Sequence, residues 1–138
     1  MVPMAAIMGP YTATFNDYVR RELEYESDLP YNIIAPLWRT WHYGEHENRY
    51  VDVADTLRKA INTNPHLKVY IANGYYDLAT PYLASEYTFS HLGLDPGLQG
   101  NLSMGYYDAG HMMYLHIPSL AKLKADLGEF LRQAITAG

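Results

Sequence analysis

The chain has 138 residues, of which 49% are hydrophobic and 18% charged, a composition typical of a globular domain with a substantial buried core. Its formal net charge of -5 argues against a nucleic acid or an anionic membrane as partner, because both attract basic surfaces, and no apolar run is long enough to span a membrane. The absence of cysteine excludes a disulfide scaffold and a thiolate metal site.

The first part of the chain is predicted to begin with a helix and to continue as irregular structure. Phe15, Tyr18, Val19 and Leu23 recur at helical spacing, which predicts a helix from Pro10 to about Tyr25. The next segment, "SDLPYNIIAPLWRTWHYGEHEN", carries two prolines, a glycine and both tryptophans, and has room for one short helix. The opening "MVPMAAIMGP" has no basic residue and is too short for a signal peptide.

The second part of the chain is predicted to alternate between helices and strands. Thr80-Pro81 is a helix-start signal, and Ser119 is expected to cap the last helix. The apolar stripe of that helix consists of Leu120, Leu123, Leu127, Phe130 and Leu131. The predicted elements are a helix over Tyr50–Asn62, a strand over Leu67–Ala72, a helix from Thr80-Pro81 to about His91, a strand over Asn101–Tyr107 and a helix from Ser119. Strands that alternate with helices favour parallel pairing, so the sequence predicts an α/β fold.

An acid and a histidine follow the two predicted strands. Asp77 follows the first strand in "IANGYYDLATP", and His111 follows the second in "DAGHMMYLHIP". Functional groups of open parallel sheets gather beyond the carboxyl ends of the strands, and adjacent strands bring their following loops together. A carboxylate that orients a histidine is two thirds of a catalytic triad, and acid before histidine is the chain order of α/β-hydrolases.

Structural roles compete with this interpretation. An aspartate before a helix is often a turn former, and a lone histidine is often a surface residue. Asp108 is a rival acid, but it lies only three residues before His111 and would have difficulty reaching the far ring nitrogen. Asp77 is therefore the preferred partner for His111.

The nucleophile of such a triad is missing from the chain. A nucleophile elbow needs the pattern G-x-S-x-G at a sharp strand-to-helix turn, and the sequence does not contain it. The stretch from Gly100 to Gly105 comes within one residue of the pattern, but Ser103 lies inside a predicted strand. The other serines, Ser27, Ser85, Ser90 and Ser119, have no elbow context either.

One pair of histidines has the spacing of a metal site. His42 and His46 are four residues apart and are flanked by Glu45 and Glu47, and two histidines so spaced on a helix can share zinc. Gly44 between them and the irregular surroundings favour a solvated polar loop instead.

Two long stretches carry a family resemblance. "NPHLKVYIANGYYDLATPYLASEYTFSHLGLD" and "MGYYDAGHMMYLHIPSLAKLKADLGEFL" resemble the C-terminal part of bacterial serine carboxypeptidases of the α/β-hydrolase superfamily. "GPYTATFNDYVRRELEYESDLPY" resembles the region that precedes them, so the likeness covers nearly the whole chain. In that family the acid lies in the segment that matches "NGYYDLATP" and the histidine in the segment that matches "AGHMMY", which correspond to Asp77 and His111.

The resemblance implies hydrolysis of C-terminal peptide bonds of a peptide substrate through an acyl-enzyme, without a metal or other cofactor. It also implies a partial α/β-hydrolase fold: residues 1–49 as a helical or irregular cap-derived segment, and residues 50–138 as the last two parallel strands with their flanking helices. The family's serine segment and oxyanion-hole donors have no counterpart in the chain and would lie upstream, as would any export signal for a periplasmic or secreted protein. The chain alone is therefore expected to be inactive.

Two further readings remain open on the sequence. Without a preceding sheet the first strand has an unpaired apolar edge, which predicts self-association of a non-catalytic module. A different α/β-hydrolase activity, such as esterase or acyl transfer, would use the same acid and histidine.

Overall fold

The computed structural model describes residues 4–136 of the chain and contains two compact units, which divide after Tyr50. Each unit has its own internal contacts, and the second holds both strands of the described residues. The two units are described separately below.

The first unit consists of one helix and an irregular segment. Helix α1 spans Met4–Arg21, so the predicted range of Pro10 to Tyr25 is wrong at both ends. Pro10 lies inside the helix, and Glu24 ends the helical turn because its backbone is left-handed, with φ of 51°. In the irregular segment, the structure forms two short 3-10 turns, Leu37–Arg39 and Gly44–His46, instead of one helix.

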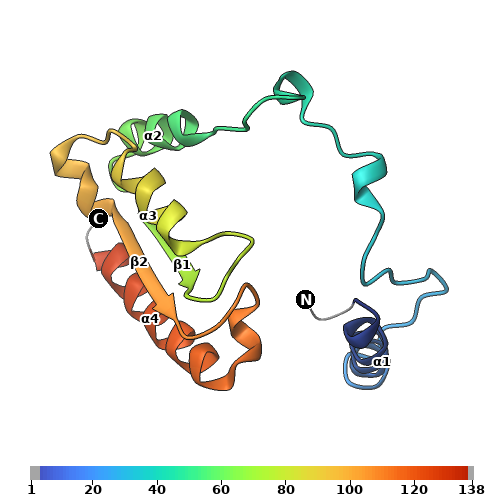
Figure 1. The fold of residues 1–138 in the computed structure, drawn as a ribbon. Helices are drawn as coiled ribbons and strands as arrows, with labels where there is room; N and C mark the ends of the chain where they lie inside the picture. The colour runs from blue at the N-terminus through green and yellow to red at the C-terminus, as the bar shows by residue number, and fades with distance from the viewer. Residues whose placement is uncertain (1–3, 137–138) are drawn as a thin grey trace. The chain divides into compact units, whose positions relative to one another are not determined.

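The second unit is built around two parallel strands. Strand β1 spans Val69–Gly74 and strand β2 spans Leu102–Tyr107, and they pair in register from Val69 with Leu102 to Gly74 with Tyr107 (Figure 1). Parallel pairing of these two strands is the arrangement that the alternation of elements predicts. The three helices of this unit are α2 (Ala54–Thr63), α3 (Tyr82–Ser90) and α4 (Ile117–Thr136).

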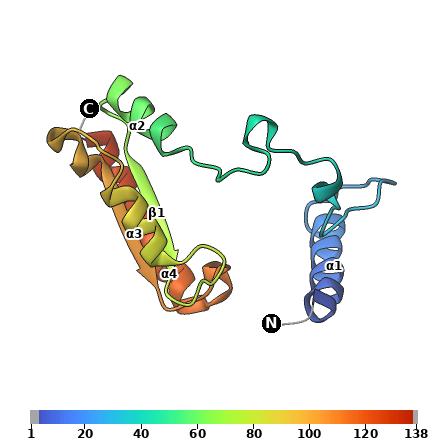
Figure 2. The ribbon, with the colours of Figure 1, turned by 45° about the horizontal axis from the view of Figure 1, so that its top comes forward.

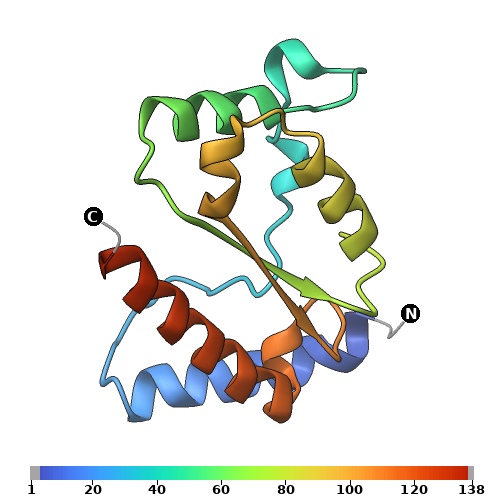
Figure 3. The ribbon, with the colours of Figure 1, turned by 90° about the vertical axis from the view of Figure 1, so that its left-hand side faces the viewer.

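The strand pair lies between two helices. Figures 2 and 3 show α3 on one face of the pair and α4 on the other, while α2 lies near the end at which the strands begin. Both strands therefore end at the side of the unit away from α2, where the loops to α3 and α4 start. This arrangement puts the residues after β1 and after β2 next to one another.

Two small hydrophobic clusters form the core of the second unit. The first centres on Ile61, Leu92 and Leu94 and joins α2 to the segment that follows α3. The second centres on Tyr107, Ala109 and Met113, with Leu123 of α4 packed against it. The second cluster lies under the loop that carries His111, so this loop is anchored on both sides of the histidine.

Two predicted helix caps are wrong. Helix α3 begins at Tyr82 after Pro81, and the Thr80 hydroxyl donates to Asp77 Oδ2 at 2.6 Å instead of capping the helix. Helix α4 begins at Ile117, so Ser119 lies in its first turn, with its hydroxyl 2.8 Å from His116 Nδ1. In both cases a nearby side chain competes for the hydroxyl that local sequence assigns to the backbone.

The described residues thus form a mixed helix and strand structure, in agreement with the predicted α/β class. Within residues 4–136, the helices are all too short or too polar to cross a membrane.

Candidate active site

Asp77 lies in a tight turn directly after β1. The turn is closed by the Asp77 N–H, which donates to the Gly74 carbonyl at 3.2 Å. Only 6% of Asp77 is exposed, so the turn buries a carboxyl group at the end of the strand. A buried carboxyl group requires hydrogen-bond donors around it, because it has lost its hydration.

The loop after β2 is tied by its backbone to the loop after β1. Tyr75 N–H donates to the Tyr107 carbonyl at 2.9 Å, and Tyr76 N–H donates to the Ala109 carbonyl at 3.0 Å. These bonds continue the parallel ladder beyond the strands. They place His111 beside Asp77 although 34 residues separate them in the chain.

Gly74 permits this close approach of the two loops. A Cβ atom at this position would lie 2.6 Å from the carbonyl oxygens of both Ala109 and Gly110. Both of these atoms belong to the backbone and cannot rotate away. The absence of a side chain at Gly74 is thus a geometric requirement for the position of His111.

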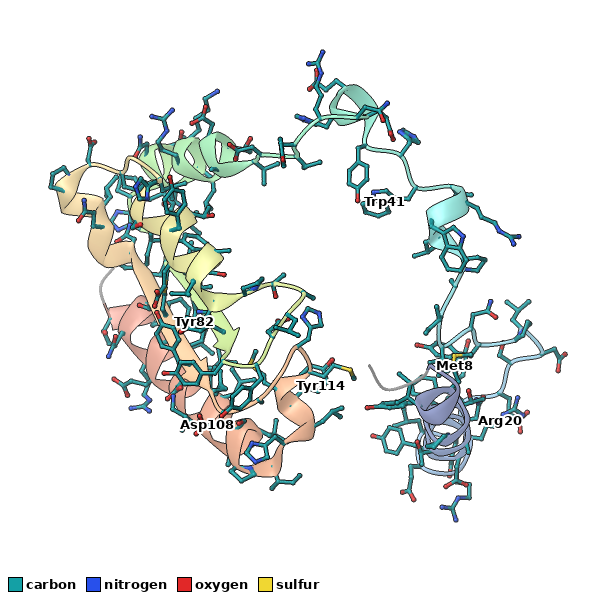
Figure 4. The ribbon with its side chains drawn as sticks, viewed as in Figure 1. Met8, Arg20, Trp41, Tyr82, Asp108 and Tyr114 are labelled. Carbon is teal, nitrogen blue, oxygen red and sulfur yellow. The ribbon has the colours of Figure 1, made fainter. Side chains whose placement is uncertain are left out.

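The structure brings Asp77 and His111 into direct contact. His111 Nδ1 lies 2.8 Å from Asp77 Oδ2, which is the length of a charge-assisted hydrogen bond (the two loops are seen at the ends of the strands in Figure 4). The carboxylate can only accept, so Nδ1 carries the proton and the lone pair of the neutral ring lies on Nε2. The His111 side chain is 64% exposed, which leaves the ring open to a reacting group.

Asp77 is surrounded by donors on both oxygens. Oδ1 accepts the N–H groups of Ala79 at 2.8 Å and Thr80 at 3.0 Å, and Oδ2 accepts the Thr80 hydroxyl and His111 Nδ1. The Thr80 hydroxyl contributes most to lowering the pKa of Asp77 far below its usual value, followed by the Thr80 N–H and the His111 ring; desolvation opposes them. Asp77 is therefore an anion at every physiological pH.

The rival acid and the serines of the chain do not join this pair. Asp108 is exposed at the end of β2 (Figure 4), and its carboxylate makes no hydrogen bond to His111 in the described part of the chain. Ser103 lies within β2, opposite Tyr70, as the sequence predicts. Across residues 4–136, the structure records no hydrogen bond between a serine hydroxyl and His111.

The histidine pair of the first unit belongs to no group of three potential metal ligands among the described residues. His46 is close to Glu45, with 3.9 Å between Nε2 and Oε1, but the described residues contain no group of three metal-ligating side chains. Gly44 has a positive φ of 58° in the 3-10 turn that includes His46. The segment between His42 and His46 is accordingly not a regular helix, on which this spacing would bring both rings together.

Several tyrosine side chains link the strands to the flanking helices by hydrogen bonds. Tyr107 is buried, with its hydroxyl 2.6 Å from that of Tyr70 and 2.9 Å from Asp126 of α4. On the other face, Tyr106 donates to Glu86 of α3 at 2.6 Å, and this bond, followed by desolvation, is the main cause that raises the pKa of Tyr106 to about 12. Helices α3 and α4 are thus each fixed to β2 by a tyrosine hydroxyl, which explains part of the excess of tyrosine over phenylalanine.

One cavity beside the sheet lies away from the pair. A hollow of about 470 Å³ is lined by residues of α3, β2 and the connecting loop, among them Glu86, Phe89 and Met104, and neither Asp77 nor His111 lines it. The pair opens to solvent on the side of the His111 ring instead.

Two site residues could not be assigned from sequence patterns. Thr80 was expected to cap α3, and the sequence pattern assigns no role to Gly74. The spacing of Asp77 and Thr80 is the one signal that was present, since Asp followed by a hydroxyl residue often forms a local turn.

Comparison of the chain with models of protein families, with curated proteins and with solved structures finds no match.

Proposed function

We propose that the chain supplies the acid and the general base of a serine carboxypeptidase with the α/β-hydrolase fold, and that the nucleophilic serine lies outside residues 1–138. The observation that carries the proposal is the 2.8 Å hydrogen bond between His111 Nδ1 and Asp77 Oδ2 at the carboxyl ends of adjacent parallel strands. The family resemblance of the two stretches that contain these residues supports the peptide substrate.

The proposed reaction uses the two nitrogens of His111 differently. Nε2 accepts the proton of the serine hydroxyl as the oxygen attacks the scissile carbonyl carbon, and then gives that proton to the leaving amine. Water attacks the acyl-enzyme in the second half of the reaction, again with Nε2 as the base. Asp77 holds the ring in the Nδ1-protonated tautomer and stabilises the imidazolium by its charge.

The exposure of the two side chains is consistent with these roles. The orienting acid should be shielded, because water would compete for its hydrogen bonds and screen its charge. The base should be accessible, because it meets the serine and the substrate. Asp77 has a side chain that is 5% exposed, whereas that of His111 is 64% exposed.

The chain by itself should not react with serine-directed inhibitors. It has no nucleophile elbow, and the oxyanion-hole donors that supply most of the transition-state stabilisation would also lie elsewhere. Incubation of purified residues 1–138 with a fluorophosphonate probe, followed by intact-mass measurement, should show no added mass. Stoichiometric labelling of any serine would refute the assignment of the nucleophile to another segment.

The activity is tested in the longest polypeptide that the coding sequence specifies in frame with Met1. We expect an upstream G-x-S-x-G segment, release of C-terminal amino acids from N-blocked peptides, and fluorophosphonate labelling of that serine. His111→Gln should lower kcat by about 10⁶-fold, because the base is lost. His116→Gln is the matched control, since His116 follows the same strand but contacts Ser119, and it should retain activity.

Retained activity in the His111→Gln enzyme would overturn the assignment of the base. Cleavage of simple esters without release of amino acids would favour the esterase or acyl-transfer alternative, which uses the same pair.

A second candidate function, self-association of a non-catalytic module, rests on the open strand edges. The sheet of the described residues has two strands, so β1 and β2 each have one unpaired edge. Backbone groups on such an edge can pair with a strand of another copy. Light scattering over a hundredfold range of concentration would show growth in mass for this candidate, and a constant monomer mass would exclude it.

A further inference from the structure

We propose that Thr80 is a positioning residue for His111: its hydroxyl fills the last free acceptor position of Asp77, which locks the carboxylate in the orientation and charge state that hold the imidazole ring. The geometry of the Asp77 turn carries the structural part of this inference. Its catalytic consequence rests on the function proposed above.

The first step concerns the number of donors at Asp77. An ionised carboxylate has about four acceptor positions, two on each oxygen. Two N–H groups occupy Oδ1, at 2.8 Å from Ala79 and 3.0 Å from Thr80. The Thr80 hydroxyl at 2.6 Å and His111 Nδ1 at 2.8 Å occupy Oδ2. All acceptor positions are therefore taken.

The second step concerns the oxygen that the hydroxyl holds directly. Because both oxygens turn together about the bond that joins the carboxyl group to Cβ, the N–H bonds to Oδ1 restrict this rotation, and the Thr80 hydroxyl adds a bond to Oδ2 itself. Oδ2 is the oxygen that meets His111, and the Thr80 hydroxyl is the donor of the turn that holds it. Since Asp77 is 6% exposed, water has little room to replace that donor.

The third step concerns the charge. When His111 becomes an imidazolium, its Nδ1 proton lies between the ring and Oδ2. A carboxylate whose remaining acceptor positions are filled binds a further proton poorly, so the proton stays on the ring. Thr80 thus keeps Asp77 an anion during the step in which His111 is charged.

Three variants of the 138-residue chain separate this role from a general effect on the fold. Thr80→Val removes the hydroxyl and keeps the shape, and Thr80→Ser keeps the hydroxyl. Thr88→Val on α3 is the control: Thr88 is also exposed, and its hydroxyl makes no hydrogen bond to another side chain in the described residues. Because Thr80 is exposed apart from its hydroxyl contact, we expect all three variants to fold.

The first measurement is the Nδ1 proton of His111, observed by ¹⁵N-edited NMR of histidine-labelled protein. In the wild-type chain we expect a downfield Nδ1 proton and the Nδ1-protonated tautomer. In Thr80→Val the exchange of this proton with water should be about tenfold faster, which is the effect of losing one hydrogen bond to a charged group. Thr80→Ser should restore the slow exchange, and Thr88→Val should leave it unchanged.

The second measurement is the carboxyl ¹³C shift of Asp77 at about pH 3, below the usual pKa of an aspartate. Asp77 should be ionised in the wild-type and Thr80→Ser chains and partly protonated in Thr80→Val. A Thr80→Val chain with wild-type proton exchange and an ionised Asp77 would overturn the proposal.

Neither measurement needs a serine or a substrate, so their outcome is independent of whether the peptidase activity is found. In an active enzyme that contains this chain, Thr80→Val should lower kcat more than it raises KM, and Thr80→Ser should restore kcat. An unchanged kcat would confine Thr80 to a structural role.

Discussion

Asp77 keeps its charge although it is almost entirely shielded from water. Burial alone would raise the pKa of the carboxyl group, because the ion loses hydration. The donors from Thr80, His111 and Ala79 outweigh this loss and lower the pKa below its usual value. A buried anion that is held this firmly is suited to orient a histidine and to balance its positive charge.

The lowered pKa of Asp77 makes the stability of the second unit depend on pH. Asp77 binds its proton more weakly in the folded chain than in the unfolded chain, so its contribution is present above the unfolded pKa of about 3.9 and is lost as pH falls toward the folded pKa. The Asp77→Asn side chain has no ionisable carboxyl group, so this contribution does not change with pH. We therefore expect the free energy of unfolding, measured by urea denaturation, to fall less between pH 5 and pH 2 in Asp77→Asn than in the wild-type chain.

Asp126 provides a check on that comparison. The pKa of Asp126 is also lowered, mainly by the hydrogen bond from Lys122. Asp126→Asn should remove a separate part of the pH dependence of the unfolding free energy. The reductions in this dependence caused by Asp77→Asn and Asp126→Asn should therefore add in the double variant. If the unfolding free energy fell equally between pH 5 and pH 2 in the wild-type and Asp77→Asn chains, Asp77 would not be a source of the pH dependence.

At the scale of the elements, the pair depends on how closely two loops approach. The parallel ladder of β1 and β2 continues into the loops through Tyr75 and Tyr76, and Gly74 lies at the point of closest contact. The loop after β1 carries Asp77 and the loop after β2 carries His111. The two side chains therefore meet only when the strands are paired.

Gly74→Ala should therefore break the contact between Asp77 and His111. The added Cβ would collide with two backbone carbonyl oxygens, and moving the loop should cost about 1–3 kcal/mol of unfolding free energy. Urea denaturation would measure this loss, and the downfield Nδ1 proton of His111 should disappear.

Gly128→Ala is a matched control in α4, where an added Cβ meets nothing within 4 Å. It should raise stability by about 0.5–1 kcal/mol, because alanine is the better helix former. A Gly74→Ala chain as stable as the wild type would show that the loops can separate without cost.

At the scale of the whole molecule, the two units differ in their cores. Every buried hydrophobic residue of the described chain lies between Ile61 and Met113, in the second unit. The first unit exposes large aromatic side chains, including Trp38 at 69% and Trp41 at 65% (Figure 4 labels Trp41). Burial of apolar surface drives folding, so the stability of the chain resides in residues 51–138.

Residues 51–138 should consequently fold without residues 1–50. We expect the amide NMR signals of β1 and β2 and the thermal midpoint to be nearly the same in the shortened and the complete chain. Limited proteolysis of the complete chain should cleave first between α1 and α2, where the backbone is irregular and exposed. Loss of the β-strand signals in the shortened chain would mean that the first unit contributes to the core.

Part of the apolar stripe of α4 remains exposed in the second unit. The sequence predicts this stripe, but Leu120 and Leu131 are 42% and 56% exposed, while Leu123 and Phe130 are half-buried. A two-stranded sheet is too narrow to cover the whole helix face. The uncovered leucines are consistent with the larger sheet of the proposed enzyme and also with self-association.

Much of the secondary structure and the identity of the candidate pair could be predicted from the sequence. The helical periodicity of the last helix and the short apolar runs of the strands are local signals, and their alternation implies parallel pairing. Parallel strands share the edge at which they end, so the sequence alone is enough to pair Asp77 with His111.

The roles of Thr80, Gly74 and Ser119 were decided only by the tertiary structure. Each depends on a competing group supplied by the fold: the Asp77 carboxylate, the carbonyls of Ala109 and Gly110, and the His116 ring. A hydroxyl has one proton to donate, and the donor and acceptor within reach are set by packing and not by sequence spacing. The sequence by itself therefore determined which residues meet at the strand ends, while the fold decided how the carboxylate between them is held.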